Sequence, residues 1–231
     1  MEHDVEYIIY LYSSKNLAHN HDEIWAVYLP GFIVSTSQTT PLTSDWKMSN
    51  KEFPYISKSI VLVGMMGAGK TCIGQRLAKR LKLPFVDADD EIEKAAGCSI
   101  SDIFQLYGET KFRDGERRVI ARLLNEPIHV LATGGGAFIN DDTRERIKNT
   151  ATSIWIRADV ELLLSRTNRR NDRPLLKDTN SREKLKELIN QRHPTYEQAN
   201  IVIDSGHESP DITVEEAIIA LKTFNSEQNC L

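Results

Sequence analysis

Residues 64–71 read GMMGAGKT, which matches the phosphate-loop pattern GxxxxGK[ST]. The loop follows the apolar run SIVLVG and precedes the helical pattern KTCIGQRLAKRL, as a phosphate loop requires. Glycines let successive backbone N–H groups turn toward one anion at the positive end of a helix. Lys70 then reaches the β- and γ-phosphates, and the Thr71 hydroxyl coordinates Mg²⁺. A glycine-rich turn without a ligand is the alternative, but the pattern favours ATP or GTP with Mg²⁺. The residues expected to hold the nucleotide here are Gly67, Ala68, Gly69, Lys70, Thr71 and Cys72.

Strand and helix patterns alternate from Ser57 onward. Short apolar runs at 59–64, 83–89, 129–136, 152–158 and 199–205 are expected to be strands of a parallel sheet, because they are apolar throughout rather than alternating. Helical patterns lie between them, including one at 181–192 that ends before Pro194 and a last one from about Val214. Ser99 with Asp102 predicts a capping box. Five strands with helical crossovers predict a three-layer α/β domain.

Composition limits the class of protein. The chain has 231 residues, 40% hydrophobic and 27% charged, which indicates one domain with an appendage. The net charge of −4 provides no basic field for nucleic acid. Three cysteines at unrelated spacings, Cys72, Cys98 and Cys230, fit neither a disulfide framework nor a zinc site, so a reducing cytoplasm is the simplest compartment.

The first 47 residues precede the alternating pattern. They lack the basic start of a secretory signal, and the apolar run at 24–34 is too short to span a bilayer, so no membrane segment is expected. We expect residues 1–47 to be a poorly ordered or non-essential extension and residues 48–231, from Met48 onward, to form the functional domain. The alternative is a small hairpin formed by residues 7–12 and 24–34.

Two carboxylates follow the second predicted strand. With a period of two, Asp87 and Asp89 would point to one face at the carboxyl edge of the sheet, where open α/β sheets bind their ligands. One carboxylate could hold the Mg²⁺ shell, and the other could orient an attacking hydroxyl and accept its proton. The alternative for one of them is a helix N-cap for DDEIEKAA.

Three consecutive glycines, Gly134, Gly135 and Gly136, follow the third predicted strand, where a phosphate-loop protein often places an acid. Because glycine is costly to order, either the backbone turns sharply there or another group approaches more closely than a side chain would permit. If Asp87 supplies the metal-shell acid, this strand tip can instead present bare N–H groups to a small substrate.

Two arginines indicate what that substrate carries. Arg113 lies on a predicted helix with Glu116 three residues on, so the acid can hold the guanidinium, and Arg192 ends another helix. If both point into one pocket, they indicate a carboxylate on the acceptor; each could equally form a surface ion pair. The arginine-rich segment at about 166–180 predicts a lid over the triphosphate, with a solvated linker as the alternative.

Together these motifs resemble the shikimate kinases. The resemblance runs from about Ser57 to Ala220 and rests on GMMGAGKT, VDADDEIE, SISDIF, GETKFRDGE, TGGG, NDRPLL and QRHPTYEQA, in the family's order and spacing; no counterpart covers residues 1–50. It implies transfer of the ATP γ-phosphate to the 3-hydroxyl of shikimate, in the route to chorismate and the aromatic amino acids. It also implies the nucleoside monophosphate kinase fold, a five-stranded parallel sheet in the order 2-3-1-4-5, and favours a monomer.

The resemblance assigns roles to the positions that match the family's motifs. Asp89 corresponds to the aspartate that binds the diol and acts as base, and Asp87 to the magnesium-shell acid. Lys70 and the lid residue Arg173 complete the catalytic set, and Arg166 lies beside the adenine. The acceptor set comprises Arg113 and Arg192 for the carboxylate, Gly135 with its neighbours Gly134 and Gly136 at the turn, Glu116 beside Arg113, and Phe104 and Phe112 as apolar walls.

One departure concerns the adenine. Many members carry an arginine in the loop after the fifth strand, whereas residues 204–210 read DSGHESP, so no side chain of this loop is assigned. Two alternatives stay open: a kinase of another small acceptor, such as gluconate or a nucleoside monophosphate, and a nucleotide-binding protein without catalysis.

Overall fold

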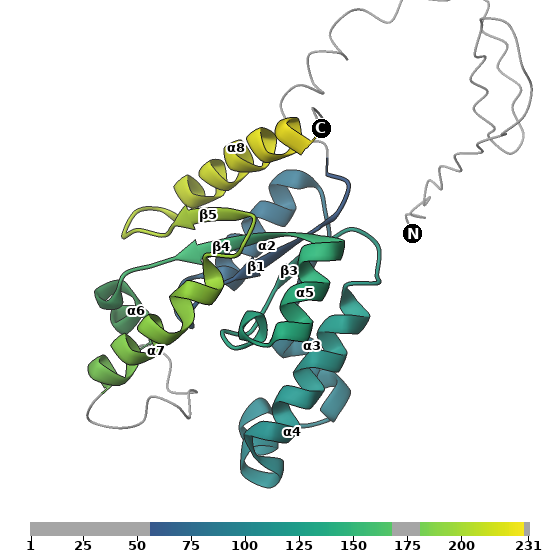
Figure 1. Cartoon of the computed structure of the whole chain (residues 1–231), viewed down its shortest axis with the longest axis vertical. Coiled ribbons are helices and arrows are strands. Elements are labelled where there is room, and N and C mark those ends of the chain that lie inside the picture. Colours follow the sequence, from purple (N-terminus) through teal and green to yellow (C-terminus); the bar gives the residue numbers. More distant parts are fainter. Residues whose placement is uncertain (1–55, 168–180, 229–231) are drawn as a thin grey trace, which may run out of the picture. The chain divides into compact units, whose positions relative to one another are not determined.

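The computed structural model describes residues 56–167 and 181–228 (Figure 1). The predicted extension at 1–47, the start at Met48 and the alternative hairpin lie outside the described residues. So do residues 168–180, which hold most of the predicted lid and Arg173. Within the described ranges, no helix is long and apolar enough to cross a membrane.

The sheet has five parallel strands in the order β2-β3-β1-β4-β5, as the family resemblance predicted. Its central strand β1 is fully buried and pairs with β3 and β4; Ile60, for example, lies opposite Val130 and Thr152. Burial on both faces explains why these strands read as continuous apolar runs. The strands are β1 (Ser59–Val63), β2 (Phe85–Asp87), β3 (Val130–Ala132), β4 (Ala151–Arg157) and β5 (Ile201–Asp204).

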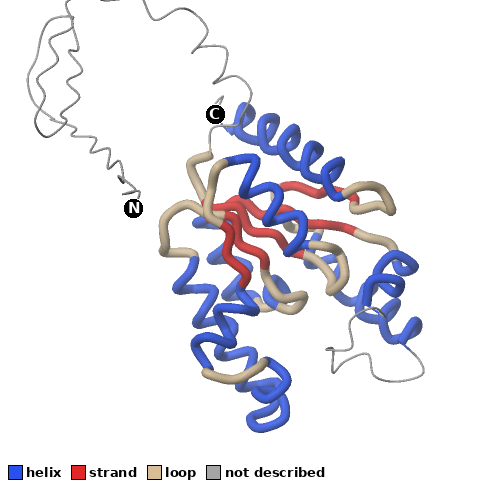
Figure 2. Tube along the Cα trace, turned by 180° about the vertical axis from the view of Figure 1, so that it is seen from behind, coloured by secondary structure: helices blue, strands red, loops and turns tan. Residues whose placement is uncertain are grey.

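Helices cover both faces of the sheet and complete three layers. Figures 1 and 2 view the molecule from opposite sides and show α5 on one face and α2 on the other. Helix α2 packs on α8 and β3, whereas α5 packs on β4 and α4. The helices are α2 (Lys70–Leu81), α3 (Ala88–Ala96), α4 (Ile100–Leu123), α5 (Asp141–Thr150), α6 (Val160–Thr167), α7 (Ser181–Tyr196) and α8 (Pro210–Gln228), with a 3₁₀ turn, η1 (Ala137–Ile139).

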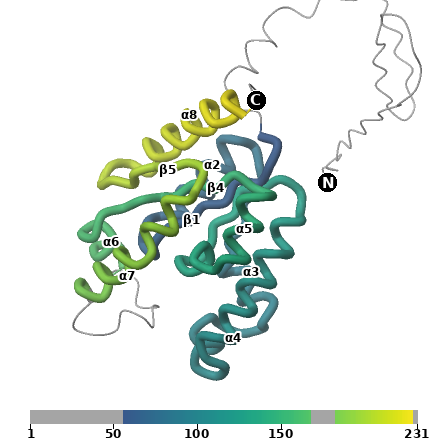
Figure 3. The backbone as a smooth tube through the Cα atoms, in the orientation of Figure 1, coloured from purple at the N-terminus to yellow at the C-terminus, as the bar shows by residue number. Residues whose placement is uncertain are grey.

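Helix α4 leads away from the sheet (Figure 3). The predicted capping box at its start is present: the Ser99 hydroxyl accepts from the Asp102 N–H, and the Asp102 carboxylate accepts from the Ser99 N–H. The helix is kinked at Gly108, whose φ of 76° and ψ of 173° are not helical. Glycine permits this break because it has no Cβ.

Two predicted helix boundaries were wrong, and proline is the reason at both. Helix α7 continues through Pro194 to Tyr196, because a proline in the last turn removes only one N–H, and the Glu197 N–H still bonds the His193 carbonyl at 2.9 Å. Helix α8 begins at Pro210 rather than near Val214. Proline suits a first helical position, where its missing N–H has no intrahelical partner to lose.

Candidate active site

The phosphate loop joins β1 to α2 and has the backbone that its glycines predict. Gly69 precedes α2 in a left-handed conformation, with φ of 98°. A Cβ on Gly64 would lie 2.5 Å from the Ile156 carbonyl oxygen, so β4 packs directly against the start of the loop. The Lys70 ammonium is buried and donates to the carbonyls of Gly64 at 2.8 Å and Met65 at 2.9 Å. These bonds hold its positive charge at the loop.

Contrary to the prediction, the acidic pair does not share one strand face, and the helix N-cap that was the alternative is confirmed for Asp87. Strand β2 ends at Asp87 and α3 begins at Ala88, so Asp87 and Asp89 do not share the face of one strand. Asp87 is the N-cap of α3: its Oδ1 accepts from the Asp89 N–H at 3.0 Å, which favours a helix start over further extended chain. Its other oxygen, Oδ2, accepts from the Thr71 hydroxyl at 2.8 Å. One carboxylate therefore joins the start of α3 to the first turn of α2.

The three glycines leave room for close neighbours, and their backbone conformation does not demand glycine. None of them has a positive φ, so the sharp turn considered from the sequence is not what demands glycine here. A Cβ on Gly134 would lie 2.7 Å from Glu116 Oε1 and 3.0 Å from Asp89 Oδ1. A Cβ on Gly136 would lie 2.4 Å from Arg113 Nη1. The turn thus packs its bare backbone against the predicted acceptor-binding side chains.

Helix α4 holds Arg113 from two sides. Its Nη1 donates to Glu116 Oε2 at 2.8 Å, the contact predicted from their spacing, and its Nη2 donates to Glu109 at 3.1 Å. Burial lowers the pKa of Arg113, but the two glutamates together outweigh this and raise it above its usual value. Burial raises the pKa of Glu116, against the lowering effect of Arg113. The guanidinium also lies 5.0 Å from the centre of the Phe112 ring, so its position is fixed before any acceptor arrives.

Arg192 approaches the glycine turn from α7. Its Nη1 donates to the Gly135 carbonyl at 3.2 Å, and the Tyr196 hydroxyl, one helical turn later, donates to the same oxygen. Sequence reasoning missed Tyr196. The signal was its spacing of four from Arg192, which puts both on one helix face, but Pro194 suggested that the helix had already ended.

Arg166 joins the phosphate loop to the loop after β5. Its Nη1 donates to the Ala68 carbonyl at 3.2 Å and to the Ser205 hydroxyl at 3.1 Å, while Nη2 donates to the Gly206 carbonyl at 2.9 Å. Arg166 is in α6, so the predicted lid begins inside a helix. Ser205 is a further cavity residue that the sequence did not single out.

One cavity of about 940 Å³ brings almost all of these groups together. The phosphate loop and Arg166 line it together with the acceptor residues, and Phe104 and Phe112 stack at 4.6 Å in its wall. Ala68 is buried and does not line it. The predicted residues that line the cavity are Gly67, Gly69, Lys70, Thr71, Cys72, Asp87, Asp89, Phe104, Phe112, Arg113, Glu116, Gly134, Gly135, Gly136, Arg166 and Arg192.

A family model described as shikimate kinase matches residues 66–222. The chain belongs to the shikimate kinase family. A shikimate kinase from Paramagnetospirillum magneticum is 57% identical over 169 residues, which cover 73% of this chain and 87% of that protein. The solved structure of shikimate kinase from Acinetobacter baumannii in complex with shikimate is 37% identical, with a TM-score of 0.70, and the match covers 76% of this chain and 97% of that one.

The shikimate kinase fold is shared with kinases of other acceptors. A gluconokinase from Sinorhizobium meliloti has a TM-score of 0.51 over 75% of this chain and 97% of its own, at 17% identity. At this identity the likeness concerns the fold alone. The choice between acceptors therefore depends on the side chains of the cavity.

Proposed function

We propose that this protein transfers the γ-phosphoryl group of ATP to the 3-hydroxyl of shikimate. The observation that carries the proposal is the single cavity with the phosphate loop at one end and two arginines, a glycine turn and an aspartate at the other. Family membership supports the same reaction. A nucleotide-binding protein without catalysis would have no use for a preformed carboxylate site in the same cavity as the loop.

The phosphate end is proposed to neutralise charge. Backbone N–H groups of 67–71 and the Lys70 ammonium would bind the β- and γ-phosphates, and Arg166 would lie beside the adenine. The lid residue Arg173 is part of this proposal as an expectation from sequence. Positioning and charge stabilisation supply most of the rate in phosphoryl transfer, so these groups would contribute more than proton transfer does.

Thr71 and Asp87 are proposed to hold Mg²⁺. A hydroxyl and a carboxylate that already lie 2.8 Å apart provide two oxygen ligands, and Mg²⁺ is usually bound by one or two protein ligands with substrate phosphates and water. The bound ion would neutralise charge on the β- and γ-phosphates.

The acceptor end is proposed to fix shikimate by its carboxylate and its hydroxyls. Arg113 and Arg192 would bind the carboxylate, since guanidinium pairs with carboxylate through two parallel hydrogen bonds. Asp89 would accept the proton of the shikimate 3-hydroxyl. The oxygen of this hydroxyl would attack the γ-phosphorus, and the bond from that phosphorus to the β-phosphate oxygen would break. The products would be shikimate 3-phosphate and ADP.

A coupled ADP-release assay tests the proposal with shikimate, gluconate and AMP as acceptors at equal concentration. We expect turnover with shikimate far above the ATPase background, and phosphorus NMR should detect a new phosphomonoester. Gluconate and AMP should stay at background. No turnover with shikimate above that background would contradict the proposal, and turnover with gluconate would favour the alternative acceptor.

A further inference from the structure

The carbonyl oxygen of Gly135 accepts hydrogen bonds from two side chains of α7, Arg192 and Tyr196. We propose that Tyr196 is a positioning residue for the acceptor: its hydroxyl holds the Gly135 carbonyl and so keeps the Arg192 guanidinium and the glycine turn in place for the carboxylate. The inference rests on the proposed function, because it concerns the acceptor end of the same cavity.

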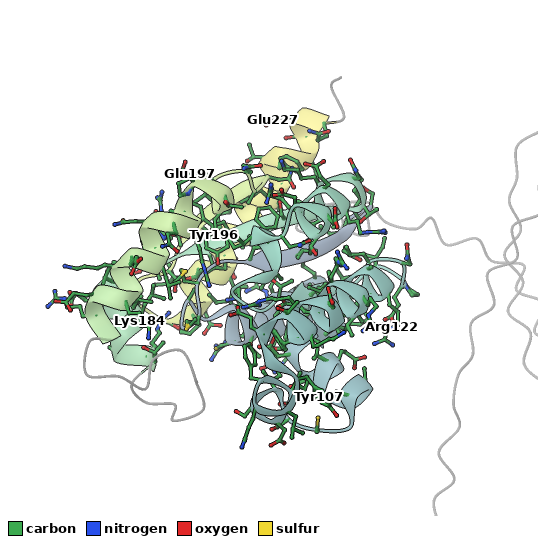
Figure 4. All side chains as sticks on the ribbon, turned by 60° about the horizontal axis from the view of Figure 1, so that its bottom comes forward. Tyr107, Arg122, Lys184, Tyr196, Glu197 and Glu227 are labelled. Carbon is green, nitrogen blue, oxygen red and sulfur yellow. The ribbon has the colours of Figure 1, made fainter. Side chains whose placement is uncertain are left out.

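Tyr196 acts from behind the cavity. Arg192 lines the cavity, whereas Tyr196 is fully buried and is not among the cavity-lining residues. Figure 4 labels Tyr196 within the body of the domain and Tyr107 near the outer end of α4. Its ring lies 5.8 Å from the Trp155 ring, and its hydroxyl lies 3.9 Å from Met65 Sδ in the phosphate loop. The side chain therefore contacts the loop and the turn without reaching the acceptor.

The Tyr196 hydroxyl stays protonated and therefore remains a hydrogen-bond donor. Burial raises the pKa of Tyr196 to about 12, so the phenol stays protonated wherever the enzyme would work. A buried phenol needs a hydrogen-bond partner, and the Gly135 carbonyl is that partner. The bond exists irrespective of pH across the neutral range, which suits a fixed structural clamp rather than a proton relay.

The clamp determines what the turn can offer to a substrate. A carbonyl oxygen has two lone pairs, and the two α7 donors use both at Gly135. The Gly135 carbonyl therefore has no free lone pair for a substrate. The glycine turn instead presents its backbone N–H groups to the cavity. Arg192 has five N–H donors. Its guanidinium bonds the Gly135 carbonyl and also interacts with the Tyr196 side chain, and its remaining N–H groups are available for a carboxylate.

The Tyr196 hydroxyl lies where the glycine turn meets the phosphate loop. A Cβ on Gly135 would lie 3.2 Å from the Met66 N of the phosphate loop, so turn and loop are in direct contact. Without the Tyr196 hydroxyl, Arg192 would be the only one of these two donors left for the Gly135 carbonyl. The Arg192 guanidinium would then move toward Gly135 and away from the carboxylate of the acceptor. Acceptor binding should weaken more than ATP binding.

The test is the variant Tyr196→Phe, which keeps the ring and removes only the hydroxyl. We expect the KM for shikimate to rise about 5- to 10-fold and the KM for ATP to stay nearly unchanged, while the loss of one buried hydrogen bond lowers the melting temperature by about 1–6 °C. The matched control is Tyr107→Phe, which removes the hydroxyl of a tyrosine that is 62% exposed and should leave all three values at wild type. In an Arg192→Ala background, Tyr196→Phe should add little further to the KM for shikimate, because its effect passes through Arg192.

Three outcomes would overturn the inference: an unchanged KM for shikimate, an equal rise in the KM values for shikimate and ATP, or a variant that fails to fold. The second and third outcomes would mean that Tyr196 contributes only to the stability of the fold. Failure of the proposed function is distinguishable, because it would appear as absent shikimate turnover in the wild-type protein.

Discussion

Replacing Gly136 by alanine should displace Arg113 and little else. Gly136 has φ of −101° and ψ of −15°, which alanine adopts without strain, so the effect comes from the added methyl group. That carbon would lie 2.4 Å from Arg113 Nη1 and 2.8 Å from Nη2, whereas ordinary contact is about 3.5 Å. The guanidinium must therefore retreat by about 1 Å, away from the position in which Glu116 and Glu109 hold it.

A displacement of about 1 Å at a positioning group costs on the order of 100-fold in rate, or about 2.7 kcal/mol. We expect kcat/KM for shikimate to fall by about that factor, largely through KM, while the KM for ATP changes less than about 2-fold. Steady-state ADP release at varied shikimate and varied ATP separates the two. The Arg113 side chain can give way, so the melting temperature should change little.

Gly115→Ala is the matched control, because Gly115 lies in the same helix as Arg113 and a Cβ there meets nothing within 4 Å. It should stabilise the protein by about 0.5–1 kcal/mol, since alanine costs less to order in a helix, and leave the kinetics unchanged. If Gly136→Ala has the same kinetics as Gly115→Ala, then either the close approach does not position Arg113 or Arg113 does not bind the acceptor.

Two further predictions concern proton transfer and pH. Asp89→Asn should lower kcat at least about 100-fold, because the variant has no proton acceptor, while calorimetry should show unchanged ATP binding; near-normal turnover would remove Asp89 from the role of base. Burial lowers the pKa of His193 below its ordinary 6.5, so the unfolded chain binds this proton more tightly than the folded one. The free energy of unfolding should therefore fall as the pH drops below 6.5. Urea titrations at pH 5 and pH 7.5 should show a smaller fall for His193→Gln than for wild type. Equal falls in the two proteins would contradict a contribution from His193.

Local sequence predicted the elements that depend on local chemistry. The phosphate loop and the capping box at Ser99 follow from residue types at fixed spacing, and both are present. The strand order came from the family resemblance. Asp87 shows where local reasoning leaves two outcomes open: an aspartate after a short strand can continue the strand or cap a helix. Its bond to the Asp89 N–H confirms the helix cap, which the sequence analysis gave as the alternative.

Residue spacing could not predict the contacts between elements that are distant in the sequence. Arg113 and Arg192 come from α4 and α7, and only the folded chain places both at one glycine turn. The reason for the glycines was equally hidden, because it is the proximity of Glu116, Arg113 and the phosphate loop rather than a backbone angle. Tyr196 was missed because Pro194 suggested that the helix had already ended. Helix α7 tolerates this proline in its last turn and continues to Tyr196.

The most direct test is the ratio of kcat/KM for shikimate to that for its methyl ester, in the wild-type protein and in Arg113→Ala. If the cavity binds the acceptor through its carboxylate, wild type should prefer the acid by about 10- to 150-fold, the value of a hydrogen bond to a charged group. The preference should fall by about 10-fold or more in Arg113→Ala, because one hydrogen bond between charged groups is lost while Arg192 remains as a partner. An unchanged ratio in the variant, or no preference in wild type, would contradict a carboxylate held at the glycine turn.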